Sequence, residues 1–202
     1  MQTKELGFDK EAVVVINNTY LLQKNISSFQ ERLDRLAPIE NSTISGFLPI
    51  PSSRNSSAVF PDAINTGTLF ICQNWPIDKD YIETFGLRIT EGRNFSDDYP
   101  TDSLALILNQ TAVEQLGWDE PIGRFLGLPV DYDPTSEVNF ETYTVIGVVE
   151  DFHSQSLHLP VEPMIMFLRS SRSMITIILQ PNTDIKSLIE DIENIWKEFV
   201  PG

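Results

Sequence analysis

The side chains of this chain best suited to metal chemistry are His153 and His158, which lie five positions apart and close to Asp151. A zinc site needs at least three protein ligands that converge on one point. Pro160 and Pro163 follow the second histidine and favour an extended backbone, because each proline restricts the residue before it. An extended segment does not bring the two rings together. We therefore predict one histidine at a strand end, the other exposed, and no metal site.

A second stretch has the spacing of a calcium-binding loop. Its alternating oxygen-bearing side chains are Asp131, Asp133, Thr135 and Glu137. Such a loop has glycine at its sixth position and glutamate at its twelfth, whereas this chain has Ser136 and Thr142 there. We therefore interpret the stretch as an acidic surface excursion.

The motifs of common catalytic sites are missing from the sequence. It contains no G-x-S-x-G elbow, no G-x-x-x-x-G-K-[ST] phosphate loop and no H-E-x-x-H pair. Carboxylates are so numerous that any catalytic pair chosen among them would be arbitrary. We predict no catalytic residues, no cofactor-binding residues and no metal ligands, and we expect a protein that is not an enzyme.

The chain of 202 residues carries a net charge of −15, placed unevenly. Residues 41–170 hold six basic and eighteen acidic side chains, which is −12 of the total. Nucleic acids and anionic membranes need clustered lysine and arginine, so the charge argues against both as partners. The single cysteine, Cys72, excludes an internal disulfide. No apolar run reaches the ~18 residues of a membrane helix and the first residues are polar. We expect a soluble piece that can derive from a membrane protein.

The first fifty residues predict strand, helix and strand. Ala12–Ile16 is an apolar, β-branched run. Ser28 and Glu31 have the spacing of a capping box. The apolar face of the helix they open is expected at Ile26, Phe29, Leu33 and Leu36, with Pro38 ending it. Ile44–Ile50 then predicts an extended segment, and a β-α-β order normally implies two parallel strands joined by a crossover.

The middle of the chain predicts a different unit. Pro51–Asn65 is rich in Ser, Asn and Pro, the composition of a linker. Short elements should follow, and the buried strand at Tyr143–Val149 is the clearest of them. The other expected elements are strands at Leu69–Cys72, Leu87–Ile89 and Leu104–Leu108, a helix at Asp78–Phe85 capped by Gly86, a helix from Asn109 to Gly117, a turn at Pro121–Gly123 and an acidic excursion over residues 129–142.

The end of the chain predicts two strands and the strongest helix. The strands are Met164–Leu168 and Met174–Leu179, joined by a hairpin at Ser170–Ser173. The helix should bury an apolar stripe made of Ile185, Leu188, Ile189, Ile192, Trp196 and Phe199. The order β-α-β, insertion, β-β-α predicts an α+β fold, in which a ferredoxin-type unit lacking its last strand is interrupted by a smaller mixed α/β unit. We place the first unit at residues 10–52 plus 160–200 and the second at residues 65–158.

Several stretches in this order resemble the extracytoplasmic core domain of MacB-type (FtsX-like) ABC transporter permeases, with a spacing like that of Bacteroidetes members. The stretches are Leu6-Gly-Phe-Asp9, Asp80-Tyr-Ile-Glu-Thr-Phe-Gly-Leu87, Glu91-Gly-Arg-Asn-Phe95, Ile107-Leu-Asn-Gln-Thr-Ala-Val-Glu-Gln-Leu-Gly117, Pro121-Ile-Gly123 and Val145-Ile-Gly-Val-Val-Glu-Asp-Phe-His153. The resemblance covers nearly the whole chain. It rests on turn glycines and strand cores, and the family offers no catalytic residues to transfer.

The resemblance implies a porter-like ferredoxin-type unit and a periplasmic position in a cytoplasmic-membrane protein. It also implies partners: a cytoplasmic ATP-binding subunit, a second permease copy or pseudo-dimer partner, and a periplasmic adaptor or outer-membrane component. We expect a non-catalytic domain that couples membrane-helix motion to a periplasmic substrate or partner. The alternative is an extracytoplasmic ligand-sensing domain that regulates its permease. Both chain ends should then emerge on one side of the porter-like unit, with the last helix returning to the side where the first strand starts.

Overall fold

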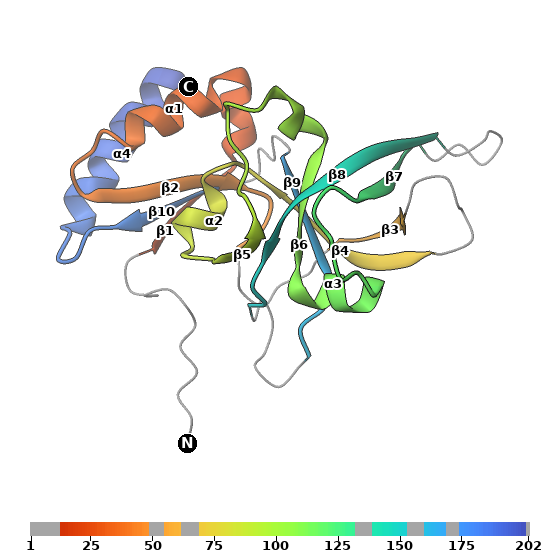
Figure 1. Ribbon diagram of the computed structural model, residues 1–202. Helices are drawn as coiled ribbons and strands as arrows, with labels where there is room; N and C mark the ends of the chain where they lie inside the picture. The colour runs from red at the N-terminus through yellow and green to blue at the C-terminus, as the bar shows by residue number, and fades with distance from the viewer. Residues whose placement is uncertain are drawn as a thin grey trace.

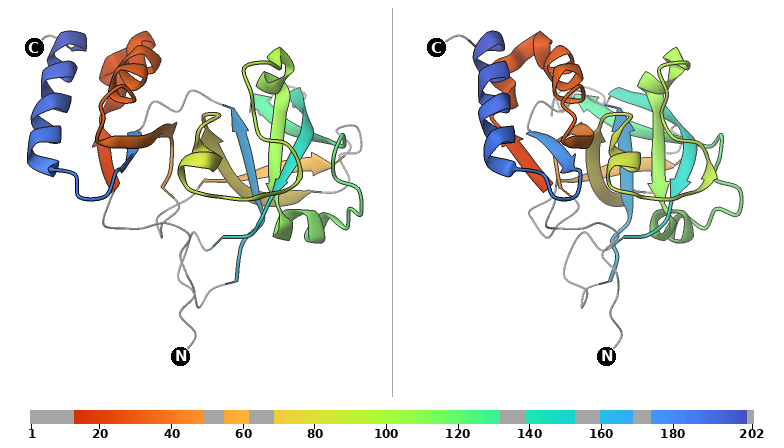
Figure 2. Two further views of the ribbon diagram at one scale, coloured as in Figure 1. Left: turned by 60° about the vertical axis from the view of Figure 1, so that its left-hand side comes forward. Right: turned by 90° about the vertical axis from the view of Figure 1, so that its left-hand side faces the viewer.

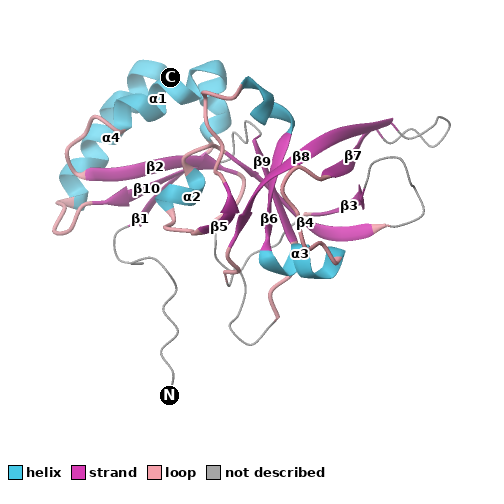
Figure 3. Cartoon of the chain, viewed as in Figure 1, coloured by secondary structure: helices cyan, strands magenta, loops and turns pink. Residues whose placement is uncertain are grey.

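The computed structural model describes residues 13–48, 55–61, 69–131, 139–152, 160–168 and 174–200. His153 and His158, the calcium-like residues Asp133, Thr135 and Glu137, and the expected hairpin at Ser170–Ser173 lie outside these ranges. Within them, the chain is mixed α/β and rich in strands (Figures 1 and 3). No helix among the described residues is both long enough and apolar enough to cross a membrane.

The two ends of the chain form one region, which we call the terminal region. It contains β1 (Val13–Asn17), the 3-10 helix η2 (Thr19–Asn25), α1 (Ile26–Leu33), β2 (Ile39–Ser45), β10 (Met174–Leu179) and α4 (Ile185–Phe199). Strand β10 lies between β1 and β2 and is antiparallel to both. Helices α1 and α4 cover one face of these strands (Figures 1 and 2).

A first core fills the space between those helices and strands. Strand β10 turns Ile175, Ile177 and Leu179 toward it, as an alternating strand with one buried face should. The other buried members are Leu22, Ile26, Phe29, Leu33, Ile39, Ile44, Leu188, Ile192 and Ile195. The predicted face of α1 is confirmed, because Ile26, Phe29 and Leu33 are buried and Leu36 packs against this core.

The central region contains the remaining elements. They are β3 (Ser56–Pro61), β4 (Phe70–Ile77), α2 (Tyr81–Thr84), β5 (Ile89–Gly92), the 3-10 helix η3 (Pro100–Leu104), β6 (Ala105–Asn109), α3 (Gln110–Leu116), β7 (Phe125–Asp131), β8 (Asn139–Val149) and β9 (Met164–Leu168). The strands pair in the order β4-β3-β7-β8-β6-β9, and β9 also pairs with β4. The path therefore closes on itself, with β5 added beside β8.

Two further cores lie in the central region. The second core contains Val59, Cys72, Leu126, Val145 and Ile165 among its buried members. The third contains Trp75, Tyr81, Phe85, Ile107 and Met166. No buried side chain of the described residues belongs both to the first core and to either of these two.

Strand β9 does not pair as the sequence analysis expected. The prediction assigned residues 160–168 to the terminal unit and paired Met164–Leu168 with Met174–Leu179. The structure pairs β9 with β4 in parallel and with β6 antiparallel. Its odd and even residues face different cores, since Ile165 joins the second and Met166 the third. A strand that contributes to a core on each face fits an interior position, whereas β10 turns Ile175, Ile177 and Leu179 to the single core beneath α1 and α4.

Other boundaries also differ from the prediction. Residues 56–61, expected in a linker, form β3. The second strand comes earlier than expected, at Ile39–Ser45. Ser28 does not cap α1, because the chain enters through η2 and the helix already begins at Ile26.

Helix α4 ends away from the start of β1, contrary to the expectation that it returns there. Strand β10 runs antiparallel to β1, and a helix that packs back onto its sheet reverses direction again. Figure 1 accordingly shows α4 finishing at the top of the view, with β1 entering from the lower side. The helix α4 runs this way because β10 is the strand that leads into it.

Candidate functional site: the junction of the two regions

The terminal and central regions meet at the end of β2 and the end of β4. The two strands share one antiparallel partner pair, Ser45 with Ile77. Backbone bonds flank that pair: the Gly46 amide donates to the Pro76 carbonyl at 3.2 Å, and the Asp78 amide to the Ile44 carbonyl at 3.1 Å. Bonds in this arrangement make Ser45 and Ile77 a narrow, non-hydrogen-bonded pair.

The carboxylate of Asp78 adds a side-chain connection across this junction. One oxygen accepts from the Thr43 hydroxyl at 2.5 Å and from the Asp80 amide at 3.2 Å. The other accepts from the Ile44 amide at 2.6 Å and from the Gln30 side chain at 3.4 Å. Asp78 follows β4, whereas three of the four donors belong to β2 and α1. The carboxylate therefore ties the central region to both layers of the terminal region.

Burial raises the pKa of Asp78 to about 6, and the Asp80 charge acts in the same direction. The Ile44 amide and the Thr43 hydroxyl oppose that rise, because they stabilise the ionised form. Gln30 is itself buried and also donates to the Ser42 carbonyl at 3.2 Å. The Ser42 carbonyl accepts from Thr84 of α2 as well, at 3.3 Å. The junction is thus a connected polar network that joins α1, β2 and α2 to Asp78.

A cleft of about 690 Å³ opens beside Asp78, between α1 and the segment from β4 to η3. Its lining includes Gln30 and Glu31 from α1, Asp34 directly after that helix, and Lys79, Asp80, Asp97, Tyr99 and Asp102 from the central region. A smaller hollow of about 240 Å³ next to it is lined by Asp34, Glu40, Asn41, Ser42, Asp80, Glu83 and Thr84. Across these hollows the charge of Asp34 contributes to a raised pKa of Asp80, for which burial is the larger cause.

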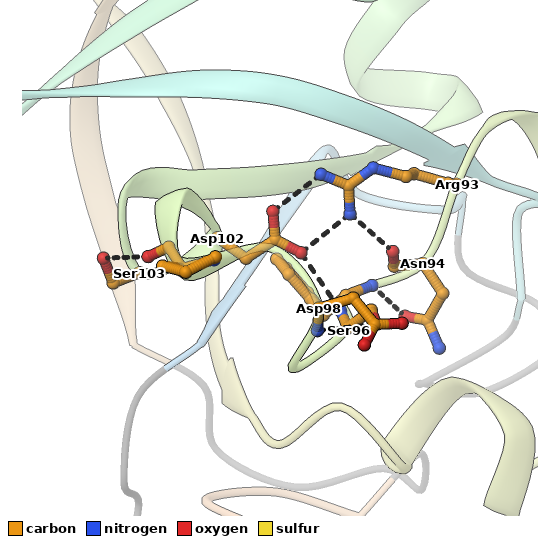
Figure 4. Close-up of polar contacts among 8 residues, drawn as sticks. Arg93, Asn94, Ser96, Asp98, Asp102 and Ser103 are labelled. Atoms are coloured by element: carbon orange, nitrogen blue, oxygen red, sulfur yellow. Dashed lines mark hydrogen bonds and ion pairs between the residues drawn. The ribbon is translucent and has the colours of Figure 1, made fainter.

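The central wall of the cleft is built on Arg93 and Asp102 (Figure 4). Both terminal nitrogens of Arg93 bond to the Asp102 carboxylate at 2.7 Å, and Asp102 also accepts from the Ser96 amide at 3.0 Å. The Asp102 side chain is 2% exposed. The bonds from Arg93 hold the pKa of Asp102 below its ordinary value. Arg93 lies over the Tyr99 ring, 3.8 Å from its centre, which fixes the loop before η3.

The glycines of the motifs Glu91-Gly-Arg-Asn-Phe95 and Val145-Ile-Gly-Val-Val149 meet as partners in the β5–β8 pair. A Cβ atom on Gly147 would lie 2.4 Å from the Arg93 carbonyl oxygen, and one on Gly92 would lie 2.2 Å from the Ile146 carbonyl oxygen. Only glycine lets the two backbones approach so closely. These motifs therefore hold Arg93 where it can reach Asp102.

The residues considered for metal binding have other roles where the structure describes them. Asp151 accepts from Asn109, and from the amide and hydroxyl of Thr111 at the start of α3. Asp131 ends β7. Among the described residues, no group of three His, Cys, Asp or Glu side chains is placed to hold a metal ion.

The sequence analysis did not single out Asp78, Gln30 or Thr43. The available signal was weak: Asp78 directly follows an apolar run and precedes a helix, a position typical of an ordinary cap. Here α2 has Asp80 at its N-cap without a side-chain bond, and Asp78 turns to β2 instead. Only the spatial neighbours identify its role.

Comparisons with known proteins agree on one kind of domain. A family model described as MacB-like periplasmic core domain matches residues 8–195. The periplasmic region of MacB from Actinobacillus actinomycetemcomitans is similar in fold, with a TM-score of 0.60 and 16% identity over 95% of this chain and 85% of that one. No curated protein sequence matches the chain.

Two further solved structures are similar in fold. A domain of a putative permease protein from Porphyromonas gingivalis has a TM-score of 0.59 at 14% identity, covering 86% of this chain and 75% of that one. The extracellular domain of the noncanonic ABC-type transporter YknZ from Gram-positive bacteria has a TM-score of 0.57 at 13% identity, covering 93% and 92%.

Proposed function

The chain belongs to the family of MacB-like periplasmic core domains, the extracytoplasmic part of ABC transporter permeases, and from this premise we propose that it transmits displacement. In this proposal the terminal region receives the motion of membrane helices, and the central region delivers it to a periplasmic substrate or partner protein. The role is mechanical and non-catalytic. The observation that supports it best is the narrow polar junction between separately packed cores.

A narrow junction favours movement of whole regions over bending within them. Apolar cores are close-packed and resist deformation, and among the described strands only the β2–β4 pair joins the terminal region to the central one, so we infer that the two regions move as separate bodies. Inside each region, most neighbouring strands share between three and six partner pairs of residues. Strands β2 and β4 share only one. Bending at Ser45–Ile77 therefore disturbs the fewest strand pairs.

Helix α4 is suited to carry force within the terminal region. It has 15 residues, which is about 22 Å at 1.5 Å per residue. Its Trp196 ring meets Phe29 of α1 edge-on, with ring centres 5.5 Å apart, and Phe199 meets the same ring at 5.5 Å. The two helices are therefore coupled by aromatic packing, so they should move together.

We propose that the two regions are the two units expected from the sequence, with β9 transferred to the central one. The terminal unit then comprises residues 10–52 and about 170–200, and the central unit about 55–168. The order β1-β10-β2, with both helices on one face, supports a ferredoxin-type, porter-like arrangement for the terminal unit.

The proposed partners follow from the family. An ATP-binding subunit on the cytoplasmic side would supply the motion, and a second permease copy would complete the transporter. A periplasmic adaptor or outer-membrane component would receive the displacement. The chain's net charge of −15 supports leaving nucleic acid out of this set.

A sensing function is the second candidate, and the cleft favours it. A hollow of about 690 Å³ is within the size range of small-ligand sites, and its lining is rich in carboxylates. Sensing predicts that a small cation such as tri-lysine raises the melting temperature of the chain at low salt in a saturable way. Transmission predicts no saturable shift.

The transmission proposal can be tested in the full-length permease assembled with its ATP-binding subunit. Spin labels at Lys197→Cys on α4 and Glu120→Cys in the central region report the distance between regions. We expect this distance to differ between the nucleotide-free and vanadate-trapped states. Labels at Asp98→Cys and Glu120→Cys, both in the central region, serve as the matched control and should show no change. An inter-region distance that is the same in the nucleotide-free and vanadate-trapped states would contradict the proposal.

A further inference from the structure

The junction contains two neighbouring threonines, of which only one has a hydrogen-bonded hydroxyl among the described residues. Thr43 donates to Asp78, and its partner residue on β10 is Thr176. Thr176 is fully buried, and among the described residues its hydroxyl has no hydrogen-bond partner. Buried hydroxyls are rarely left unpaired, because desolvation without a bond is unfavourable. An unused acceptor therefore lies directly beside the hydroxyl that holds Asp78.

The two oxygens of Asp78 differ in how they can take up a proton. Oδ2 accepts two N–H donors, from Ile44 and Gln30, which cannot reverse their direction. Oδ1 accepts the Thr43 hydroxyl, which can either donate or accept. Oδ1 can therefore take up a proton from solvent if the Thr43 hydroxyl rotates and donates its hydrogen to another acceptor. The hydroxyl of Thr176 is the neighbour that can receive it.

We propose that Asp78, Thr43 and Thr176 form a proton-operated latch across the junction. When Asp78 is ionised, Thr43 and the Ile44 amide donate to it. When Asp78 takes a proton, it donates to Thr43, and Thr43 donates to Thr176. Keeping a buried carboxylate charged costs desolvation that separation of the regions would relieve, so the ionised junction opens more readily and the protonated latch holds the regions together more firmly.

The surroundings place this change within a useful pH range. Burial raises the pKa of Asp78 to about 6. The protonated latch is therefore present below that pH, and the junction weakens as pH rises through it. The charged groups lining the hollows around Asp78 are Glu31 on α1, Asp34 directly after α1, Glu40 on β2, Lys79 and Asp80 beside Asp78, Glu83 on α2, Asp97, and Asp102 paired with Arg93. Most are acidic, and among them Asp80 contributes to the raised pKa.

The latch deepens the proposed function, since it rests on the same two regions moving about the same junction. It would make that movement depend on the pH outside the membrane. Its test uses the 202-residue chain alone and no nucleotide. A failure of the latch is therefore distinguishable from a failure of the nucleotide-driven movement.

The first readout is the amide proton of Ile44, followed by NMR from about pH 4 to about pH 8. Because this amide donates to Asp78, its resonance should titrate with Asp78, near pH 6. Asp78→Asn should abolish that titration. Thr176→Val removes the alternative acceptor and should lower the midpoint by at least about half a unit, because the protonated state loses a bond. Thr90→Val, which removes a hydroxyl bonded to Val148 on β8, is the matched control and should leave the midpoint unchanged.

The second readout is the distance across the cleft, measured between spin labels at Ser27→Cys and Ser103→Cys. Cys72 can remain, because burial raises the pKa of its thiol to about 12 and leaves it unreactive. The distance distribution should broaden above the Ile44 midpoint, and Asp78→Asn, which stays uncharged, should remain narrow at every pH. An Ile44 amide that does not titrate overturns the latch. A distance distribution that does not change with pH also overturns the latch, as does a Thr176→Val midpoint equal to that of Thr90→Val.

Discussion

The side chain of Asn109 donates to the carboxylate of Asp151 at 2.9 Å, although 42 positions separate them in the chain. The same carboxamide donates to the Glu162 carbonyl, while its oxygen accepts from the amides of Ala112 and Met164. Asn109 thus caps α3 and joins it to the end of β8 and the start of β9. Asn109 and Asp151 lie in two of the stretches on which the resemblance in the sequence analysis rests, and these stretches meet at this contact.

Replacing Asn109 by alanine should therefore be severely destabilising. The change removes a helix cap and leaves buried amides without partners, so the free energy of unfolding should fall by about 2–4 kcal/mol. Gln110→Ala is the control, because Gln110 is exposed and its one described bond, from the Asp151 amide, is 3.2 Å long. It should change stability by less than about 0.5 kcal/mol. Urea unfolding followed by circular dichroism measures both.

Gly147→Ala tests the close approach of β5 and β8. The added methyl would lie 2.4 Å from a backbone oxygen, so we expect a loss of about 3 kcal/mol or more, or no folded protein. Gly117→Ala is the comparison, since nothing lies within 4 Å of its Cβ position. Its positive φ of 66° should cost only about 1 kcal/mol. Equal melting temperatures for the two variants would contradict the structure.

Arg93→Lys tests the bidentate pair with Asp102. Lysine cannot form both bonds at once, and Asp102 is buried, so the free energy of unfolding should fall by about 2 kcal/mol at neutral pH. The loss is smaller than for a fully buried pair, because solvent screens Arg93, which is 35% exposed. The pKa of Asp102 is lowered in the folded state, so the pair stabilises above the ordinary aspartate pKa and the effect fades as pH falls through the folded value. The stability difference between variant and parent should therefore shrink toward about pH 3. A difference that grows on acidification would reverse this assignment.

The apolar stripe of α4 gives a ranking of substitutions. Leu188 is 1% exposed, so Leu188→Ala should cost about 3 kcal/mol. Trp196 is half-buried and contacts Phe29, so its replacement by alanine should cost about 2 kcal/mol, less than for a buried ring. Ile185 and Ile189 are 47% and 43% exposed, and their replacement should change stability by less than about 1 kcal/mol. Thermal unfolding of the four variants checks the order.

Local features of the fold were predictable from the sequence where one residue decides them. Asn109 caps α3, and Gly117 ends it with a left-handed φ of 66°, as their types predict. Asp184 caps α4 and accepts from two amides of its first turn. Tyr81, Ile82 and Phe85 point inward from the short helix α2, and Gly86 follows in the left-handed conformation. In each case the interaction lies within one turn of the chain.

Features that depend on distant partners were not predictable. Met164–Leu168 and Met174–Leu179 are both short apolar runs, and only their neighbours show that β9 faces two cores while β10 faces one. On α4 the stripe was drawn through Ile185 and Ile189, but α1 and the sheet cover Ile195 instead. Asp78 gives no signal in its own stretch of sequence, because the donors that make it a connection come from β2 and α1.

The central claim is that the regions must move relative to each other at the β2–β4 junction, and a removable disulfide tests it most directly. Ser45 and Ile77 form a narrow antiparallel pair, in which the Cα atoms are close enough, at about 4.5 Å, for a disulfide. The matched control is Ala58 with Ile71, inside the central region. The Asn74 amide donates to the Asn55 carbonyl, so the alternation of the ladder makes this pair narrow too.

The decisive measurement is whether the full-length permease carrying Ser45→Cys and Ile77→Cys restores the phenotype of a strain lacking that permease. We predict that the oxidised pair fails to restore it and that reduction recovers it. The Ala58→Cys/Ile71→Cys permease should restore it in both states, with disulfide formation verified in each. Full activity of the oxidised junction pair would contradict the account.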